Sequence, residues 1–288
     1  MVLRNKKYFY LFLSPVLFLV AVFLVYPLFR TLLYSFTSWR NFSVKQTFIG
    51  FDNYRQLFSD QVIALSLRNS FIMMVFVFIF QIGVAVILAI LVDSTKRLFR
   101  FLRTVYFFPI LISATAIGLM FKLMYTYEYG LLNFFVTLFG GEKQVWLTAK
   151  SAIFLVTIPI MWQYVGFYFI IFLAGISKIS QDIYESAELD GINSFQKAVY
   201  ITIPLMRDVI TSSVILVISG CFKVFDMVFV ISGGGPLNSS ELLSTYMYNM
   251  AFVKYNGGYA STIAIVIIVL GTGITVVMRK VLEEKSDN

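Results

Sequence analysis

Six apolar stretches, each long enough to cross a bilayer, limit what this sequence can fold into. Crossing the hydrocarbon layer as a helix takes about 20 apolar residues. Because lipid offers no hydrogen-bond partners, the backbone of each stretch must satisfy its own polar groups, which favours helices. The stretches lie near residues 9–36, 67–92, 104–126, 151–176, 208–231 and 259–279. The sequence therefore predicts an all-α polytopic membrane protein with six transmembrane helices, in which residues 1–288 form a single transmembrane domain.

The composition agrees with a chain that lies mostly in lipid. Only 13% of the residues are charged and 59% are hydrophobic, whereas soluble domains carry about 25% charged residues. Aromatic residues make up 18%, which suits lipid-facing and interfacial helix surfaces. The formal net charge of +8 is spread along loops without a binding motif, so we expect membrane lipid and no nucleic acid as a partner.

The residue inventory excludes several kinds of chemistry. The chain has no His and one Cys, Cys221, so a zinc site, a His-based triad and a disulfide framework lack their parts. We expect no catalytic residue, metal or cofactor in this chain. The apolar run from Tyr8 to Leu33 is too long for the core of a signal peptide and lacks a small-x-small cleavage site, which predicts an uncleaved anchor helix.

Lys and Arg residues in the short loops predict the orientation. They concentrate near the amino end, after the second span and at the carboxyl end, whereas Arg40, Lys45 and Arg55 on the other side leave the bias incomplete. Since positive loops stay inside, these segments, both termini and the loop 177–207 should be cytoplasmic. The basic residues of the three segments are Arg4, Lys6, Lys7, Lys96, Arg97, Arg100, Arg103, Arg279, Lys280 and Lys285.

The loop between the fourth and fifth spans is predicted to form two short helices. Ser180 is a suitable N-cap for the first, and Gly191 is a suitable stop. Asn193, followed three residues later by Gln196, matches a capping box for the second helix, which should end near Pro204. A stiff helix-turn-helix of this kind could push on a partner protein. The alternative is an amphipathic connector that rests at the lipid headgroups.

The residues of this loop resemble the EAA loop of ABC importer permeases. Residues 184–191 match its first part, with Ser186 in place of the first Ala, and residues 201–204 match the Ile and Pro that follow. The resemblance implies a coupling helix that docks on a separate ATPase subunit, which binds ATP and Mg in place of this chain. We expect Glu185 to meet a basic residue there. The residues expected to couple to the ATPase are Tyr184, Glu185, Ser186, Ala187, Asp190 and Gly191.

Further segments resemble carbohydrate-uptake permeases of the maltose-transporter type, and their order from Phe225 onward is similar to the F-type subunit. The matching segments are residues 49–54, 103–109, 130–133, 225–226, 233–236, 246–252 and 258–260. The resemblance implies a type I ABC importer permease fold in the cytoplasmic (inner) membrane of a bacterium or archaeon. The implied partners are a homologous second permease subunit, two ATPase subunits and an extracytoplasmic sugar-binding protein. The implied cargo is a di- or oligosaccharide.

A glycine-rich turn follows the fifth span. Gly233, Gly234 and Gly235 before Pro236 allow positive φ and a close approach to another chain. No Walker Lys follows the turn, so it is not a phosphate-binding loop. We expect it to contact the docked binding protein or the pore mouth. The alternative is a tight re-entry turn with no such contact.

Polar residues inside the spans suggest where a cargo passes, since buried charges in lipid are costly. On the fifth span, Lys223 and Asp226 are three residues apart and are predicted to share a helix face and pair, either lining a solvated cavity or holding neighbouring helices. The fourth span carries aromatic rings and an amide, which suit sugars or simple packing. The resemblance implies that sugar sits between these two spans. The expected substrate-pathway residues are Gln163, Tyr164, Phe167, Gly220, Cys221, Lys223, Val224 and Asp226.

Three other functions compete with a sugar permease. Glycerol phosphate is carried by related permeases, but a phosphate favours an Arg in the cavity and the central spans contain only Lys223. A membrane enzyme needs a constellation of reactive groups at depth, for which only Lys223 with Asp226 is available. A secondary transporter usually has more spans and an inverted repeat.

Overall fold

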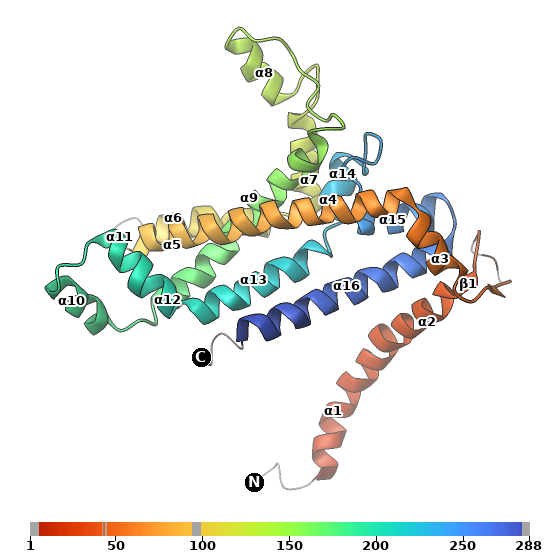
Figure 1. The fold of residues 1–288 in the computed structure, drawn as a ribbon, viewed down its shortest axis with the longest axis horizontal. Coiled ribbons are helices and arrows are strands. Elements are labelled where there is room, and N and C mark those ends of the chain that lie inside the picture. Colours follow the sequence, from red (N-terminus) through yellow and green to blue (C-terminus); the bar gives the residue numbers. More distant parts are fainter. Residues whose placement is uncertain (1–5, 42, 44, 94–98, 284–288) are drawn as a thin grey trace. The chain divides into compact units, whose positions relative to one another are not determined.

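A computed structural model of the chain describes residues 6–41, 43, 45–93 and 99–283. The described chain divides into two compact units (Figure 1). The first combines residues up to 60 with residues 247–269, and the second combines residues 61–246 with those from 270 onward. Helix α16 (Gly257–Glu283) contributes to both units.

The first unit begins with a long apolar helical run and ends in a small polar region. The run consists of α1 (Lys6–Val20), the π-helical turn η2 (Ala21–Val25) and α2 (Tyr26–Ser35). Strands β1 (Thr37–Ser38) and β2 (Thr47–Phe48) then pair antiparallel, and α3 (Asp52–Ser59) follows. The π-helical turn η6 (Asn249–Val253) leads into the first part of α16.

Two of the segments that resemble sugar permeases, residues 49–54 and 258–260, contact the same stretch of chain after α2 inside this first unit. The Asn53 amide donates to the backbone carbonyls of Ser35 at 2.9 Å and Thr37 at 3.0 Å. From α16, the Tyr259 hydroxyl donates to the Asp60 carboxylate at 2.7 Å. A Cβ atom on Gly258 would lie 2.1 Å from the Thr37 carbonyl oxygen. The start of α16 therefore lies directly against the segment that follows α2.

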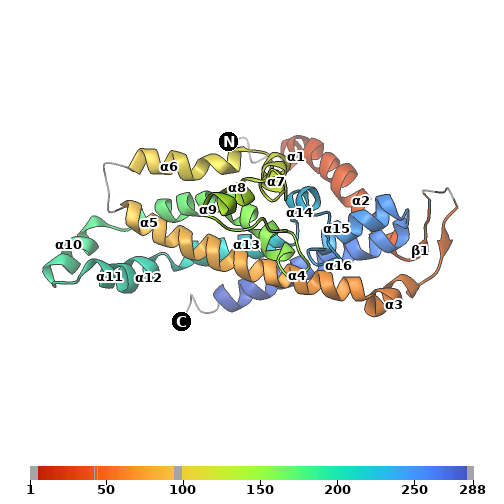
Figure 2. The ribbon, with the colours of Figure 1, turned by 90° about the horizontal axis from the view of Figure 1, so that it is seen from above.

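The second unit is a bundle around α9 (Ala152–Ile176). One long neighbour consists of α4 (Gln61–Phe78), η3 (Ile79–Val84) and α5 (Ala85–Asp93). The others include α6 (Phe99–Phe107) with η4 (Phe108–Leu111), and α13 (Arg207–Cys221). Figure 2 shows these helices running roughly alongside one another. The core is apolar, and Phe169 and Phe172 of α9 are fully buried in it.

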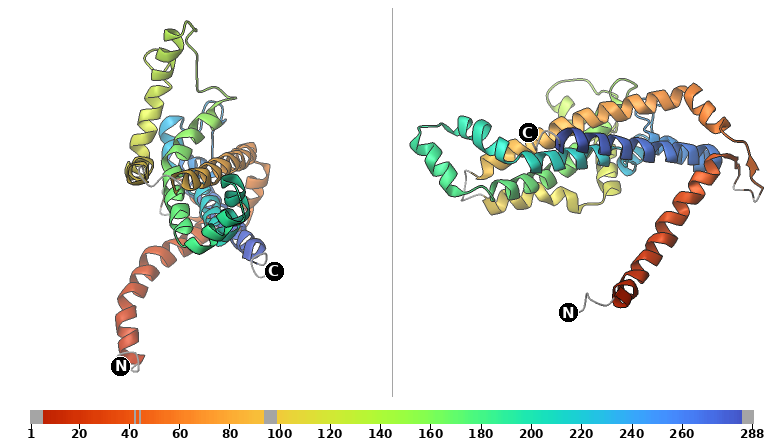
Figure 3. Two further views of the ribbon diagram at one scale, coloured as in Figure 1. Left: turned by 90° about the vertical axis from the view of Figure 1, so that its left-hand side faces the viewer. Right: turned by 60° about the horizontal axis from the view of Figure 1, so that its bottom comes forward.

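Shorter elements accompany this bundle. They include α14 (Asp226–Ile231), which packs against α7 (Ala114–Met124), as well as α15 (Leu243–Tyr248) and α8 (Leu131–Leu138), which projects away from the long helices (Figure 1). At one end of the bundle, α10 (Gln181–Leu189), α11 (Ser194–Lys197), η5 (Ala198–Thr202) and α12 (Ile203–Leu205) form a helical hairpin that extends past α5 and α9 (Figures 2 and 3).

The predicted multi-pass helical fold is confirmed, although two spans are bent. Among the described residues, four helical stretches are long and apolar enough to cross a membrane, namely Tyr10–Ser35, Gln61–Asp93, Ala152–Ile176 and Gly257–Val281. Two bent helix pairs raise the number to six if each pair is one span. They are Phe101–Leu111 with Ala114–Met124, bent by 92°, and Ser194–Leu205 with Arg207–Cys221, bent by 71°.

The expected third and fifth spans are not single helices. In the third, Ile112 adopts an extended backbone (φ −85°, ψ 138°), and Ser113 caps the helix that follows. In the fifth, the helix ends at Cys221 and a new one begins at Asp226, after Phe225 at φ −140°. Both interruptions lie near the middle of an expected span and leave backbone groups without intrahelical partners.

Candidate functional site

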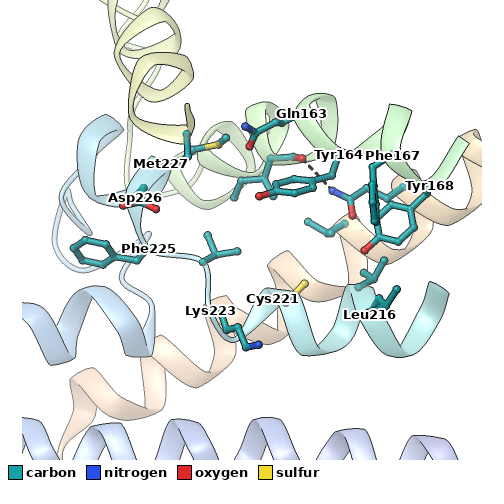
Figure 4. Close-up of a pocket in the computed structure, with 17 residues that line it drawn as sticks. Gln163, Tyr164, Phe167, Tyr168, Leu216, Cys221, Lys223, Phe225, Asp226 and Met227 are labelled. Carbon is teal, nitrogen blue, oxygen red and sulfur yellow. Dashed lines mark hydrogen bonds between the residues drawn. The ribbon is translucent and has the colours of Figure 1, made fainter. Parts of the chain in front are cut away.

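A cavity of about 340 Å³ lies in the second unit, between α9 and the interrupted end of α13 (Figure 4). It brings together all of the residues that the sequence suggested for the substrate pathway. Gln163, Tyr164, Phe167, Gly220, Cys221, Lys223, Val224 and Asp226 line this one space. That a cargo passes through the cavity stays a prediction.

Gln163 on α9 is fixed by the break in the third span. Its side chain is 3% exposed, and the Nε2 atom donates to the Ile112 carbonyl at 2.9 Å. Because that carbonyl can only accept, the amide must turn its NH₂ group toward it. The Oε1 atom is then buried without a hydrogen-bond partner among the described residues. Gln163 thus joins α9 to the helix break and keeps one acceptor unused.

Gly166, one turn further along α9, permits a close contact between two backbones. A Cβ atom at this position would lie 1.7 Å from the Tyr106 carbonyl oxygen of α6. No side chain can occupy that space without separating the two helices. Gly166 and Gln163 together hold the chain from α6 to Ile112 against α9, the helix that forms one wall of the cavity.

The opposite wall carries the two charged residues, and one prediction about them is wrong. Lys223 and Asp226 do not share a helix face, because α13 ends at Cys221 and Asp226 opens α14. No ion pair joins the two in the part of the chain that the structure describes. Both side chains are exposed, and Figure 4 shows them apart from each other, at the two ends of the turn that connects α13 to α14.

Several lining residues were missed from the sequence, among them Gln81 and Tyr168. Gln81 is buried in the second span, and its Nε2 donates to the Ile160 carbonyl at 3.0 Å. An amide inside an apolar span was a visible signal, since such groups face protein or water. Tyr168 follows Phe167 in an aromatic run, where the sequence gives no indication of which ring faces the cavity.

The helix-turn-helix predicted between the fourth and fifth spans is confirmed. The Ser180 hydroxyl accepts a hydrogen bond from the Asp182 backbone at 3.3 Å and caps α10. The helix ends just before Gly191, which adopts φ +77°. Asn193 and Gln196 form a complete capping box, with bonds of 2.9 and 3.1 Å.

Contacts between the two arms stiffen this hairpin. Lys197 forms a 2.7 Å ion pair with Glu188, and its Nζ atom lies 5.6 Å from the centre of the Tyr184 ring. The Tyr184 and Thr202 hydroxyls are 3.1 Å apart. The hydrogen bond from Lys197 holds the pKa of Glu188 below its ordinary value. These contacts join the two arms of the hairpin.

The residues expected to contact an ATPase differ in accessibility. Glu185 is exposed and makes no ion pair within the described residues, whereas Ala187 is buried inside the hairpin. Leu189 at the tip is 90% exposed. Tyr184 is half-buried, and Ser186, Asp190 and Gly191 are exposed.

The glycine-rich turn makes an internal contact. Gly233 and Gly234 adopt φ +58° and +87°, which L side chains rarely do. A Cβ atom on Gly234 would lie 2.2 Å from Oε2 of the buried Glu241. The Ser240 hydroxyl donates to the Gly235 carbonyl at 2.8 Å. This contact accounts for Gly234, and a contact of the turn with a binding protein or the pore mouth stays a prediction.

Part of the charge argument lies outside the described residues. Arg4, Lys96, Arg97 and Lys285, which contributed to the expected orientation, are in segments that the structure does not describe. The cytoplasmic location of both termini therefore stays a prediction.

The second unit combines a bundle of apolar helices, interrupted spans around a cavity, and the hairpin of α10 to α12. This combination is typical of a membrane transport component. The chain belongs to the family of binding-protein-dependent transport system inner membrane components, which matches residues 81–286. The predicted family and inner-membrane location are thereby confirmed.

Two relatives are similar to the chain over nearly its whole length. The probable ABC transporter permease protein YurN of Bacillus subtilis is 37% identical over 97% of each chain. The lactose transport system permease protein LacF of Rhizobium radiobacter is 34% identical over 92% of each chain. The chain is therefore a permease subunit, which is a transport component.

Solved structures of a bacterial alginate importer share the fold. One has a TM-score of 0.87 at 20% identity and covers 97% of this chain and 96% of its own. A second has a TM-score of 0.84 at 19% identity, covers 95% and 93%, and contains an alginate pentasaccharide-bound periplasmic protein. The expected type I importer permease fold is confirmed.

Proposed function

We propose that this chain forms half of the translocation pathway of an ABC importer for a di- or oligosaccharide. The cavity between α9 and α13 carries this proposal. It combines aromatic rings, on which the C–H faces of sugars stack, with amide, hydroxyl and charged groups that bind sugar hydroxyls. The relative named for lactose transport supports this cargo class.

In this proposal, the hairpin of α10 to α12 transmits force from a separate ATPase subunit, which binds ATP and Mg. Its two arms are joined by the Glu188–Lys197 ion pair, and an exposed Leu189 stands at its tip. A braced hairpin moves as one body, whereas a flexible loop would absorb the motion. ATP-driven closure of the ATPases would then switch the cavity between inward and outward access.

The assembly that we propose contains a homologous second permease subunit, two ATPase subunits and an extracytoplasmic sugar-binding protein. Both termini and the hairpin lie in the cytoplasm. The alginate importer with its bound periplasmic protein supports a partner of this kind. An alternative cargo is glycerol phosphate or another small polar solute, which the cation of Lys223 would favour and the anion of Asp226 would oppose.

The test is to purify the chain with its ATPase and second permease subunits and to add the cognate binding protein. We expect particular oligosaccharides to stimulate ATP hydrolysis and ATP depletion to stop uptake. Uptake that survived ATP depletion but collapsed with the ion gradient would contradict the proposal and favour a secondary transporter.

Glu185→Ala tests the coupling role of the hairpin. We expect weaker ATPase association and less uptake with the membrane fold intact, because the substitution removes the exposed carboxylate that pairs with a basic residue of the ATPase. Glu142→Ala, the same change in an exposed segment outside the hairpin, is the matched control. Co-purification of the ATPase and uptake rates are measured for both. Unchanged association and uptake in Glu185→Ala would oppose the assignment.

A further inference from the structure

The described residues of this chain that line the cavity carry no net charge. Of the described residues that line it, Lys223 and Asp226 have the only side chains that are ionised at neutral pH. Their charges are opposite, so a charged cargo finds one favourable and one unfavourable partner. A cavity built for a phosphate or an acidic sugar would instead hold an excess of cations.

Neither charge is paired within the part of the chain that the structure describes. Lys223 and Asp226 are exposed, and no ion pair involves either side chain in the described residues. The break between α13 and α14 places them on the same turn without bringing them into contact. Each is therefore available to a cargo, one as a strong donor and the other as a strong acceptor of hydrogen bonds.

The uncharged groups of the wall point to the same cargo chemistry. The buried Oε1 atom of Gln163 has no hydrogen-bond partner among the described residues and can only accept a hydrogen bond. A hydroxyl of any sugar supplies such a donor, so this atom favours a hydroxyl-rich cargo, and the charge class follows from Lys223 and Asp226. The phenol rings of Tyr164 and Tyr168 line the same space and offer both stacking surfaces and hydroxyls.

We infer that this cavity takes an uncharged, hydroxyl-rich cargo and discriminates against an oligosaccharide that carries a uronate or phosphate group. This inference rests on the proposed function, because it assigns the charge class of the same cargo. The bacterial transporter that shares the fold is involved in the import of the acidic polysaccharide alginate. The fold therefore leaves the charge class of the cargo open, and the lining residues set it.

A cysteine introduced beside the cavity can report the binding of cargo there, and this readout does not depend on the binding protein. Gly220 lines the cavity, is exposed and has open space where a Cβ atom would go. Gly220→Cys in a Cys221→Ser background therefore gives a single reactive thiol in this chain. Its alkylation by an uncharged thiol reagent is followed by mass spectrometry in the assembled transporter, with a neutral oligosaccharide or its uronic-acid counterpart present.

The inference predicts that the neutral oligosaccharide slows labelling at a lower concentration than the uronate does. Asp226→Asn leaves the wall with a net positive charge. It should therefore lower the ratio of the two protecting concentrations, uronate over neutral sugar, about tenfold, which corresponds to about 1.4 kcal/mol. Lys223→Gln should raise that ratio. Asp52→Asn removes the same charge from an exposed helix of the first unit and should leave the ratio unchanged.

The outcomes separate this inference from the proposed function. If the uronate protects the unchanged cavity as well as the neutral sugar does, or if Asp226→Asn leaves the ratio as it was, the charge assignment is overturned while the pathway stands. If neither sugar protects at any concentration, cargo does not enter this cavity, and both proposals fail.

Discussion

At the scale of single residues, backbone contacts set the shape of the site as much as side chains do. Gly166 lies in the aromatic run of α9, where the sequence suggested a sugar-binding surface. In the structure it permits α9 to touch the Tyr106 carbonyl of α6. The residue matters because it lacks a side chain, and the polar groups beside it depend on that close approach.

Gly166→Ala should destabilise the protein, because the added Cβ would lie 1.7 Å from the Tyr106 oxygen and force α6 and α9 apart. Overpacking of this kind typically costs about 1–3 kcal/mol. Gly83→Ala is the matched control, since a Cβ there meets nothing within 4 Å. Thermal unfolding in detergent compares the two. An equal melting temperature for both variants would show that the helices can relax.

Residues that act on their neighbours in sequence could be predicted, whereas those that act across the fold could not. The caps at Ser180 and Asn193 depend only on nearby backbone groups and were correctly predicted. The contact between Gly234 and Glu241 needs the folded turn. Lys223 and Asp226 were assigned to one helix because nothing in residues 222–225 marks a break.

At the scale of elements, the interrupted spans explain how a mostly apolar bundle holds polar groups. The third span had signals, because Pro109 precedes the break and Ser113 is a good N-cap. The fifth span contains no Pro at its break, where Phe225 adopts φ −140°. Apolar length alone thus predicted where spans lie and missed how they bend.

The segment between α7 and α9 depends on one buried amide. Nδ2 of Asn133 donates to the carbonyls of Tyr127 and Gln144 at 2.9 Å each, and its Oδ1 accepts from the Gln144 backbone and the Trp146 ring at 3.0 Å each. The residue is 1% exposed. The motif that resembled sugar permeases at this position therefore has a structural role.

Asn133→Asp should loosen this segment, because the new carboxylate faces two carbonyls that lose their donor. Each buried polar group left without a partner costs about 1–3 kcal/mol. Limited proteolysis across residues 125–150 should become faster while the hairpin of α10 to α12 is unaffected. Asn41→Asp, the same change at an exposed turn of the first unit, is the control. Equal cleavage of the two variants would argue against this role.

The brace within the hairpin should depend on pH. Lys197 lowers the pKa of Glu188, so the pair stabilises the hairpin above the ordinary Glu value of about 4.3. That contribution is lost as the pH falls through the lowered pKa of the folded state. A spin label at Leu189→Cys in a Cys221→Ser background should become more mobile as the pH falls through that lowered pKa. Lys197→Gln should remove the transition, and an unchanged transition would exclude this pair.

At the scale of the whole molecule, the class of protein was accessible from the sequence. Six apolar stretches predicted a multi-pass membrane fold, and ordered short motifs predicted the transporter family that the comparison then showed. The sequence suggested many of the residues that line the cavity. It did not predict the helix breaks that create the cavity. Side chains on separate helices meet only after the bundle has formed.

The central claim is that the hairpin between α9 and α13 is cytoplasmic and is held by an ATPase subunit. Leu189→Cys in a Cys221→Ser background tests it, because Leu189 is 90% exposed at the tip. In sealed cells, the account predicts that a membrane-impermeant thiol reagent does not reach this cysteine from outside and that a short cross-linker joins it to the ATPase. Labelling from the outer face, without cross-linking to the ATPase, would contradict the account.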